Sequence, residues 1–363
     1  TFEIPFKDTE RTENFDIIKH KKGDKSVMFH IQNNIDQYSG DRDLYNSFHS
    51  IITSILKSLG GGYYFQKHDI FLSKKFNKDI KSSDFLENEY FKKFNGLEYK
   101  GVESYITITK EKKKKVIGGV EEEEGEIENI INKVLNILGD NNFYPSPVSW
   151  ENFNLLINRF IGLNFSEENF STNNFQVNKK ELVFDRDKIV RSIPLIDNEE
   201  LDLPNSISPS ASINLGYTFP VDLFNFLNEA RGYKEIIYHQ LIHIPEQKAE
   251  MIRLEGKKKR HGSMPGAGND KSFEDIEEVE KKITNDKQLV VYGHFKVIIS
   301  CEDYTKLNRL SNFIDQSVFD YGIVPSKRST NQYELFMGNL PGNAREIKIY
   351  DKFWTTSDPM VCF

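Results

Sequence analysis

The chain has 363 residues, of which 38% are hydrophobic and 13% aromatic, so it can form packed cores and is not a disordered polymer. Its net charge of -7 argues against non-specific nucleic-acid binding, because phosphate neutralisation needs clustered Lys and Arg. The two cysteines, Cys301 and Cys362, lie far apart and support neither a disulfide framework nor a zinc ribbon. No apolar run approaches the length of a transmembrane span.

Strand and helix patterns alternate in the first 140 residues. The predicted strands are 15–18, 26–31, 63–72 and 104–109, and the predicted helices are 44–59, 83–94 and 127–138. Gly60–Gly62 ends the first helix, and Ser83 or Asp84 caps the second. This order is typical of an α+β domain in which helices pack on a sheet.

The second part of the chain continues in the same mixed style. Its predicted strands are 182–184, 233–244 and 289–299, and its predicted helices are 150–160, 273–283 and 304–318. We place a boundary near residue 141, which gives an N-terminal subdomain 1–140 and a second subdomain 141–363. The predicted fold class is α+β, with each subdomain a mainly antiparallel or mixed sheet covered by helices.

Two segments carry runs of charge. Residues 110–126 contain Lys112–Lys115 followed by Glu121–Glu124, and Lys257–Arg260 forms a second basic run. Solvated loops are the preferred interpretation of both. The alternative is that the lysines contact nucleic acid or anionic lipid. Contact with nucleic acid would correspond to a rival function as a single-stranded DNA-binding module, with aromatic stacking beside the basic runs.

The glycine-rich segment Gly262–Ser272 precedes a predicted helix and partly matches a phosphate-binding loop. That loop requires G-x-x-x-x-G-K-[ST], but Asp270 stands where the last glycine should be and would repel phosphate. We therefore predict a surface loop. A self-contained nucleotide-binding protein that uses this segment remains the alternative function.

His239 and His243 have the spacing of a helical zinc motif, but their apolar surroundings favour a strand. Residues four apart in a strand are separated by about 13 Å, which no single metal ion bridges. We find no nucleophile motif and no defined acid–base pair. The sequence thus indicates no catalytic residue, no metal site and no cofactor site in this chain.

The two ends of the chain are unusual. It begins at Thr1 without an initiator Met, and it stops at Val361-Cys362-Phe363, residues that look like the start of a strand. Natural termini usually fray into polar residues. We expect this chain to be a piece of a longer protein.

Several segments, taken in order from about Ile17 to Phe363, carry a resemblance to a known family, and they include the helix 85–94 and the strand 105–110. The helix 44–59 precedes an aromatic strand that contains Gln66, Lys67, His68 and Asp69. Near the other end, Leu340, Pro341, Gly342 and Asn343 form a Pro-Gly-Asn loop that precedes the segment 353–356. In order and spacing these segments resemble the TraG-family ATPases of conjugative transposons, which belong to the VirB-type ATPases of type IV secretion systems.

The resemblance implies a role without catalysis for this chain. In the family, the Walker A phosphate loop lies downstream of the position of Phe363, and that domain would bind ATP and Mg²⁺. The N-terminal region anchors the motor to the inner-membrane complex and supports subunit assembly. The expected partners are other secretion subunits and further copies of the full-length protein, with no direct DNA binding by this part. The expected location is cytoplasmic and peripheral at the inner membrane.

Overall fold

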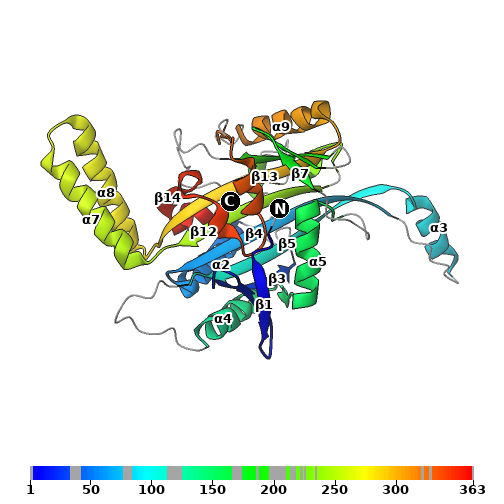
Figure 1. Cartoon of the computed structure of the whole chain (residues 1–363), viewed down its shortest axis with the longest axis horizontal. Helices are drawn as coiled ribbons and strands as arrows, with labels where there is room; N and C mark the ends of the chain where they lie inside the picture. The colour runs from blue at the N-terminus through cyan, green and yellow to red at the C-terminus, as the bar shows by residue number, and fades with distance from the viewer. Residues whose placement is uncertain are drawn as a thin grey trace.

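The computed structural model describes most of the chain. The described residues are 3–32, 42–76, 84–112, 125–165, 174–184, 188–195, 210–212, 218–220, 224, 226–233, 235–319, 323–326 and 329–361, with side chains of the first helix described from residue 49 onward. Within these ranges, helices pack on both faces of one large sheet (Figure 1). The predicted α+β class is confirmed.

The main sheet has 12 strands in the order β1-β2-β3-β5-β4-β12-β13-β9-β8-β7, with β6 beside β3 and β14 beside β13. These strands are β1 (Phe6–Arg11), β2 (Asp16–His20), β3 (Lys25–Ile31), β4 (Tyr63–Lys75), β5 (Glu98–Lys110), β6 (Ser146–Pro147), β7 (Phe175–Val177), β8 (Leu182–Phe184), β9 (Lys188–Pro194), β12 (Glu235–Ile244), β13 (Val290–Cys301) and β14 (Phe353–Thr356). The described strand pairs are antiparallel. Two short strands, β10 (Ser210–Ser212) and β11 (Thr218–Pro220), pair with each other separately.

The two parts of the chain share this sheet. Strand β4 from residues 1–140 pairs with β12 from residues 141–363 along a register that runs from Leu72↔Glu235 to Tyr63↔Ile244. The prediction of a separate sheet on each side of residue 141 is therefore wrong, because strands from both sides form one continuous sheet. Its central strands β12 and β13 are buried almost throughout, as expected for strands with helices on both faces.

Each face of the sheet has its own hydrophobic core. On one face, Phe29, Phe65 and Tyr238 pack against α2, α4 and α9; on the other, Met28 and Ile237 pack against α5 and α10. The helices are α2 (Arg42–Leu59), α3 (Phe85–Phe94), α4 (Glu126–Asp140), α5 (Trp150–Gly162), α6 (Phe226–Glu229), α7 (Gln247–Ser263), α8 (Ala267–Asn285), α9 (Tyr304–Phe319), α10 (Gln332–Met337) and α11 (Ser357–Val361), with 3-10 turns η1 (Ala344–Glu346) and η2 (Ile349–Asp351).

Two helical features project from opposite ends of the molecule (Figure 1). The 13-residue strands β4 and β5 continue beyond the sheet as a hairpin that carries α3 at its tip. Asp84 caps α3 by accepting a hydrogen bond from the backbone N–H of Leu86 at 2.8 Å, which confirms the predicted cap. At the other end, α7 and α8 form an antiparallel helical hairpin.

The edge of β9 is completed by a side chain. Strand β8 pairs with β9 only as far as Val190, and the Gln332 amide takes over at Ser192. The Ser192 N–H donates to Gln332 Oε1 at 2.7 Å, and Gln332 Nε2 donates to the Ser192 carbonyl at 3.0 Å. Because Gln332 is buried, this amide satisfies two backbone groups that water does not reach.

We expect Gln332→Ala to lower the free energy of unfolding by about 2 kcal/mol, because it leaves both Ser192 backbone groups without a partner. Urea denaturation followed by circular dichroism measures this change. Gln332→Met is the matched control, since it keeps the side-chain volume without the hydrogen bonds. A Met variant as stable as the parent protein would contradict the assignment.

Candidate functional site

Two of the segments that belong to the family resemblance, the strand with Gln66–Asp69 and the loop with Leu340–Asn343, lie in contact in the structure. On β4, Gln66 Oε1 accepts a hydrogen bond from the Gly342 N–H at 2.8 Å, and Gln66 Nε2 lies 3.4 Å from the carbonyl oxygen of Leu340. His68 Nε2 donates to the carbonyl oxygen of Asn339 at 2.7 Å. Residues more than 270 positions apart thus form one buried junction between the sheet and the loop 338–343.

Gly342 is required at its position by the geometry of this junction. Its φ angle is +83°, in the left-handed region that favours glycine. A Cβ atom built there would lie 2.9 Å from Ser26 Oγ and 3.1 Å from His20 Cε1. The loop is also fixed from within, because Asn343 Nδ2 donates to the carbonyl oxygen of Met337 at 3.0 Å.

Lys67 and Asp69 alternate with Gln66 and His68 along β4, so they lie on its other face. Lys67 Nζ forms an ion pair with Asp69 Oδ2 at 2.7 Å, and Ser104 Oγ donates to Asp69 Oδ1 at 2.6 Å. The four predicted residues of this strand therefore divide into two pairs, and only Gln66 and His68 reach the loop.

A layer of buried histidines continues from His68 across the sheet. The His68 ring stacks on His239 of β12 with ring centroids 4.5 Å apart. Gln66 Nε2 lies 3.1 Å from His239 Nε2. The hydrogen bond from the Gly342 N–H to Gln66 Oε1 fixes the orientation of the Gln66 amide, so Gln66 Nε2 is the donor to His239 Nε2. His239 therefore carries its proton on Nδ1. Burial lowers the pKa of His68 to about 3, and it lowers the pKa of His239 well below its ordinary value.

Strand β13 adds His294 and Lys296 to this layer. His294 Nδ1 donates to the carbonyl oxygen of Asp351 at 2.7 Å, and Lys296 Nζ donates to the carbonyl oxygen of Leu335 at 2.6 Å. Burial lowers the pKa of both side chains well below their ordinary values. The nearby positive charge of Lys296 also lowers the pKa of His294, but by less than burial does. The layer thus connects β4, β12 and β13 to residues 335–351.

Several polar atoms of this layer have no hydrogen-bond partner among the described residues. They are His68 Nδ1, His239 Nδ1, His294 Nε2 and both side-chain amide atoms of Asn339. The layer is closed to solvent, since His68, His239 and Asn339 are fully buried. Its geometry suits a neutral polar junction that holds the C-terminal segment on the sheet. It is not a site that a substrate could enter.

The structure places His239 and His243 on strand β12, which confirms the predicted strand. His243 stacks on Tyr64 with ring centroids 4.2 Å apart, and its Nε2 lies 3.7 Å from Glu111 Oε2. His239 lies in the buried layer instead. Within the described part of the chain, no group of three or more His, Cys, Asp or Glu residues could hold a metal ion.

The prediction of surface loops at Lys257–Arg260 and Gly262–Ser272 was wrong. Lys257–Arg260 belongs to α7, and α8 begins at Ala267, so only Met264–Gly266 connects the two helices. Antiparallel pairing stabilises both helices, because Lys258 forms ion pairs with Glu277 and Glu280 of α8. The residues predicted as a candidate phosphate loop are consequently the end of one helix and the start of the next.

The other charged segment lies largely outside the described residues. Lys113–Lys115 and Glu121–Glu124 are in that part, so the structure does not bear on their predicted loop. Lys112 is described, and its backbone N–H donates to Asp24 Oδ1 at 2.9 Å. Asp24 also pairs with Arg345 at 3.1 Å, which links this turn to the segment that follows the 338–343 loop.

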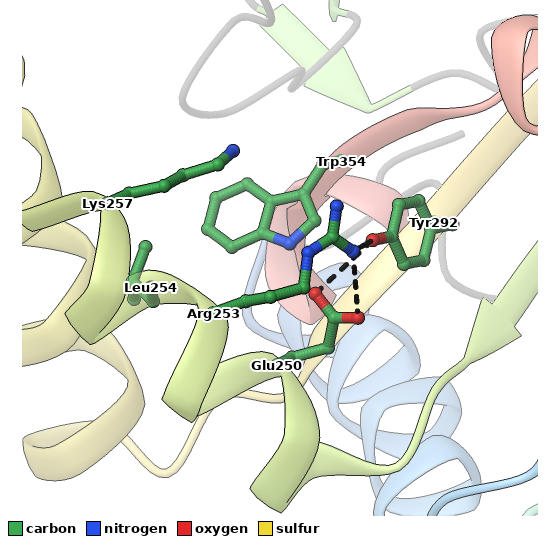
Figure 2. Close-up of a pocket in the computed structure, with 6 residues that line it drawn as sticks. All are labelled: Glu250, Arg253, Leu254, Lys257, Tyr292 and Trp354. Carbon is green, nitrogen blue, oxygen red and sulfur yellow. Dashed lines mark hydrogen bonds and ion pairs between the residues drawn. The ribbon is translucent and has the colours of Figure 1, made fainter.

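Two surface depressions were not predicted from the sequence. A small pocket of about 90 Å³ lies at the base of α7, where Arg253 Nη1 donates to Tyr292 Oη at 2.8 Å and Trp354 forms one wall (Figure 2). A wider groove of about 870 Å³ runs between α9 and residues 324–326 and 329–330, with Arg191 of β9 also in its lining. The pocket is too small for a nucleotide, since ligand sites usually measure roughly 300–1,000 Å³.

Comparison with known proteins adds no assignment. No protein-family model matches the chain, and no curated protein matches it either. The resemblance to secretion ATPases therefore stays a prediction from the residues. Within the described residues, no helix combines the length and apolar character needed to cross a bilayer.

Proposed function

We propose that this chain is the docking and assembly region of a type IV secretion ATPase of the VirB type. In this proposal it anchors the motor to the inner-membrane complex and catalyses no reaction itself. ATP and Mg²⁺ would bind a domain downstream of Phe363. The chain would lie in the cytoplasm, peripheral at the inner membrane, with other secretion subunits as its partners.

The observation that carries this proposal is the α3 arm, which we define as the outer part of the β4–β5 hairpin together with α3. None of the residues of α3 is buried. Phe85, Leu86 and Tyr90 are 73%, 76% and 57% exposed, and Leu97 and Tyr99 beside them are also exposed. Exposed apolar groups gathered at one place are typical of protein interaction sites, and aromatic residues are enriched in interface cores.

The contact between Gln66, His68 and the 338–343 loop supports the proposal in a second way. Both segments belong to the resemblance, and a rigid junction between them suits a scaffold better than a catalytic site. The rival function as a nucleotide-binding protein loses its main support, because Gly262–Ser272 lies in a helical hairpin instead of a loop between a strand and a helix.

We expect the double substitution Leu86→Glu and Tyr90→Glu to reduce conjugative DNA transfer about tenfold or more when introduced into the full-length protein. Burying two carboxylates in an apolar interface costs well over the 1.4 kcal/mol that corresponds to a tenfold change. The measurement is transfer frequency in mating assays, together with the cellular amount of the variant protein.

Leu155→Glu is the matched control, because Leu155 of α5 is 57% exposed but lies away from the arm. It should leave transfer unchanged. Photo-crosslinking from position 86 should in addition capture a subunit of the secretion apparatus. Normal transfer by the double variant, at normal protein amount, would reject the arm as the docking surface.

A further inference from the structure

The small pocket at the base of α7 is built from one helix and two strands (Figure 2). Glu250, Arg253 and Lys257 follow one another on α7 at three- and four-residue spacing, so they share one face of the helix. Tyr292 of β13 lies directly opposite Trp354 of β14 in the antiparallel register. The helix thus contributes the charged groups, and the sheet contributes two aromatic rings.

Arg253 is held in this pocket through one of its nitrogens. Its Nη1 donates to Tyr292 Oη at 2.8 Å and to Glu250 Oε1 at 3.3 Å. The Tyr292 hydroxyl in turn donates to Glu250 Oε2 at 3.2 Å. Both oxygens of the buried Glu250 carboxylate are therefore engaged, and the guanidinium is oriented before any ligand arrives.

The polar groups that remain unused in the pocket are all donors. Arg253 Nη2 and Nε, Lys257 Nζ and the Trp354 indole N–H form no hydrogen bond or ion pair with the described residues. Figure 2 likewise draws its dashed contacts only among Glu250, Arg253 and Tyr292. Arg, Lys and Trp side chains cannot accept hydrogen bonds. A group that fits this pocket must therefore be an acceptor, and the two cations favour an anion.

Charge and size restrict this anion further. Two cations against the single Glu250 carboxylate leave one net positive charge in the lining. A singly charged carboxylate matches this balance, whereas a doubly charged phosphate would be repelled more strongly by Glu250. The volume of about 90 Å³ admits a group of only a few heavy atoms. Leu254 and the Trp354 ring complete the lining, which suits the methylene groups that carry a side-chain carboxylate.

We propose that this pocket binds the side-chain carboxylate of an acidic residue in a partner polypeptide. Arg253 and Lys257 bond the carboxylate oxygens through their unused donors, and the Trp354 ring packs on the methylene groups. The inference goes beyond the proposed docking role and does not depend on it. The pocket lies at the base of α7, whereas the α3 arm projects from the opposite end of the molecule (Figure 1).

The fluorescence of Trp354 provides the measurement. The chain contains two tryptophans, and the other, Trp150, lies on α5 and stacks on Phe153. In a Trp150→Phe protein the emission therefore reports on Trp354 alone. We expect titration with acetyl-Gly-Glu-Gly-amide to give a saturable change in emission, with a dissociation constant on the order of 1 mM. The matched peptide acetyl-Gly-Gln-Gly-amide, which lacks the charge, should give no such change at the same ionic strength.

Two lysine substitutions separate the pocket from the general charge of α7. Lys257→Gln should weaken binding of the acidic peptide about threefold to fivefold, because it removes one of the two cations in the lining. It breaks no contact with the described residues, so misfolding would not explain the loss. Lys259→Gln is the matched control, since Lys259 belongs to the same helix but does not line the pocket, and it should leave the affinity unchanged. Arg253→Gln should weaken binding about tenfold or more.

An equal response to both peptides, no saturable response to the acidic peptide, or an unchanged affinity in Lys257→Gln would each overturn the proposal. Inorganic phosphate is titrated as a third probe. Tighter binding of phosphate than of the acidic peptide would assign the pocket to a phosphate group and would equally overturn the proposal. These outcomes are independent of the α3 arm, because the titration contains only this chain and a short peptide, whereas the mating assay tests the arm.

Discussion

Lowering the pH from about 7.5 to about 5.5 is expected to reduce the free energy of unfolding by several kcal/mol. The cause is the set of buried histidines. Burial lowers the pKa of His20 to about 4 and of His68 to about 3, and it lowers the pKa of His239 and His294 well below the ordinary value. A domain has only about 5–15 kcal/mol of stability, so this loss is large.

The direction follows from proton binding. In the unfolded chain these histidines titrate near pH 6.5, whereas in the folded chain they stay neutral to much lower pH. Below pH 6.5 the unfolded state therefore binds more protons, and stability falls as the pH falls. The stability is present in full above pH 6.5 and is lost progressively toward the folded-state pKa values. A histidine that stays neutral in the folded chain down to pH 5.5 contributes about 1 kcal/mol over this interval.

Urea denaturation at several pH values measures how the free energy of unfolding changes with pH. His68→Gln is the informative variant, because glutamine can still donate to the Asn339 carbonyl oxygen but does not titrate. It should lose about 1 kcal/mol less stability than the parent between the two pH values. An unchanged pH dependence in this variant would show that His68 is not held neutral by the fold.

The sequence predicted individual helices and strands well, because apolar spacing and helix-ending glycines are visible in it directly. The helix expected over 44–59 is α2, and Gly60 and Gly62 after it have φ angles of +72° and +84°, as a helix end requires. The strand expected over 289–299 is β13, which is buried along its whole length. Apolar spacing and glycine punctuation are short-range features, so they need no knowledge of the rest of the fold.

The sequence did not predict which distant segments pair. These pairings join the two halves of the chain into one sheet, and they bring Gln66 and His68 into contact with the 338–343 loop. Strand β4 could pair with any of several apolar strands, and nothing local identifies β12 as its neighbour. The contact between Gln66 and Gly342 joins residues 276 positions apart. The signal that was available is polar residues within an otherwise apolar strand, since buried Gln66 and His68 must find hydrogen-bond partners somewhere in the fold.

The error at α7 has a different cause. Lys257–Arg260 and the nearby glycines are typical of a loop, and α7 has no continuous apolar face that would identify it as a helix. Ion pairs between α7 and α8 supply part of the missing stability. Apolar spacing in the sequence does not identify a helix that is stabilised by ion pairs with its neighbour instead of by an apolar stripe of its own.

Gly342→Ala is expected to lower the free energy of unfolding by about 3 kcal/mol, because two costs combine at this position. Its φ angle of +83° strains any residue that has a Cβ atom. The added methyl group would also press on Ser26 Oγ and the His20 ring, which bond each other at 2.7 Å. Any shift of the loop weakens the hydrogen bond from the Gly342 N–H to Gln66. Urea denaturation at neutral pH measures the change.

Gly60→Ala separates the two costs. Gly60 has a φ angle of +72°, but no atom lies within 4 Å of the Cβ position there. This variant should lose only the backbone contribution, about 1 kcal/mol. The difference between the two variants then measures the close packing of the 338–343 loop on His20 and Ser26. If the two variants lose the same free energy of unfolding, the 338–343 loop can move to make room for the added methyl group. The junction between Gln66, His68 and this loop would then not be the rigid connection that the docking role requires.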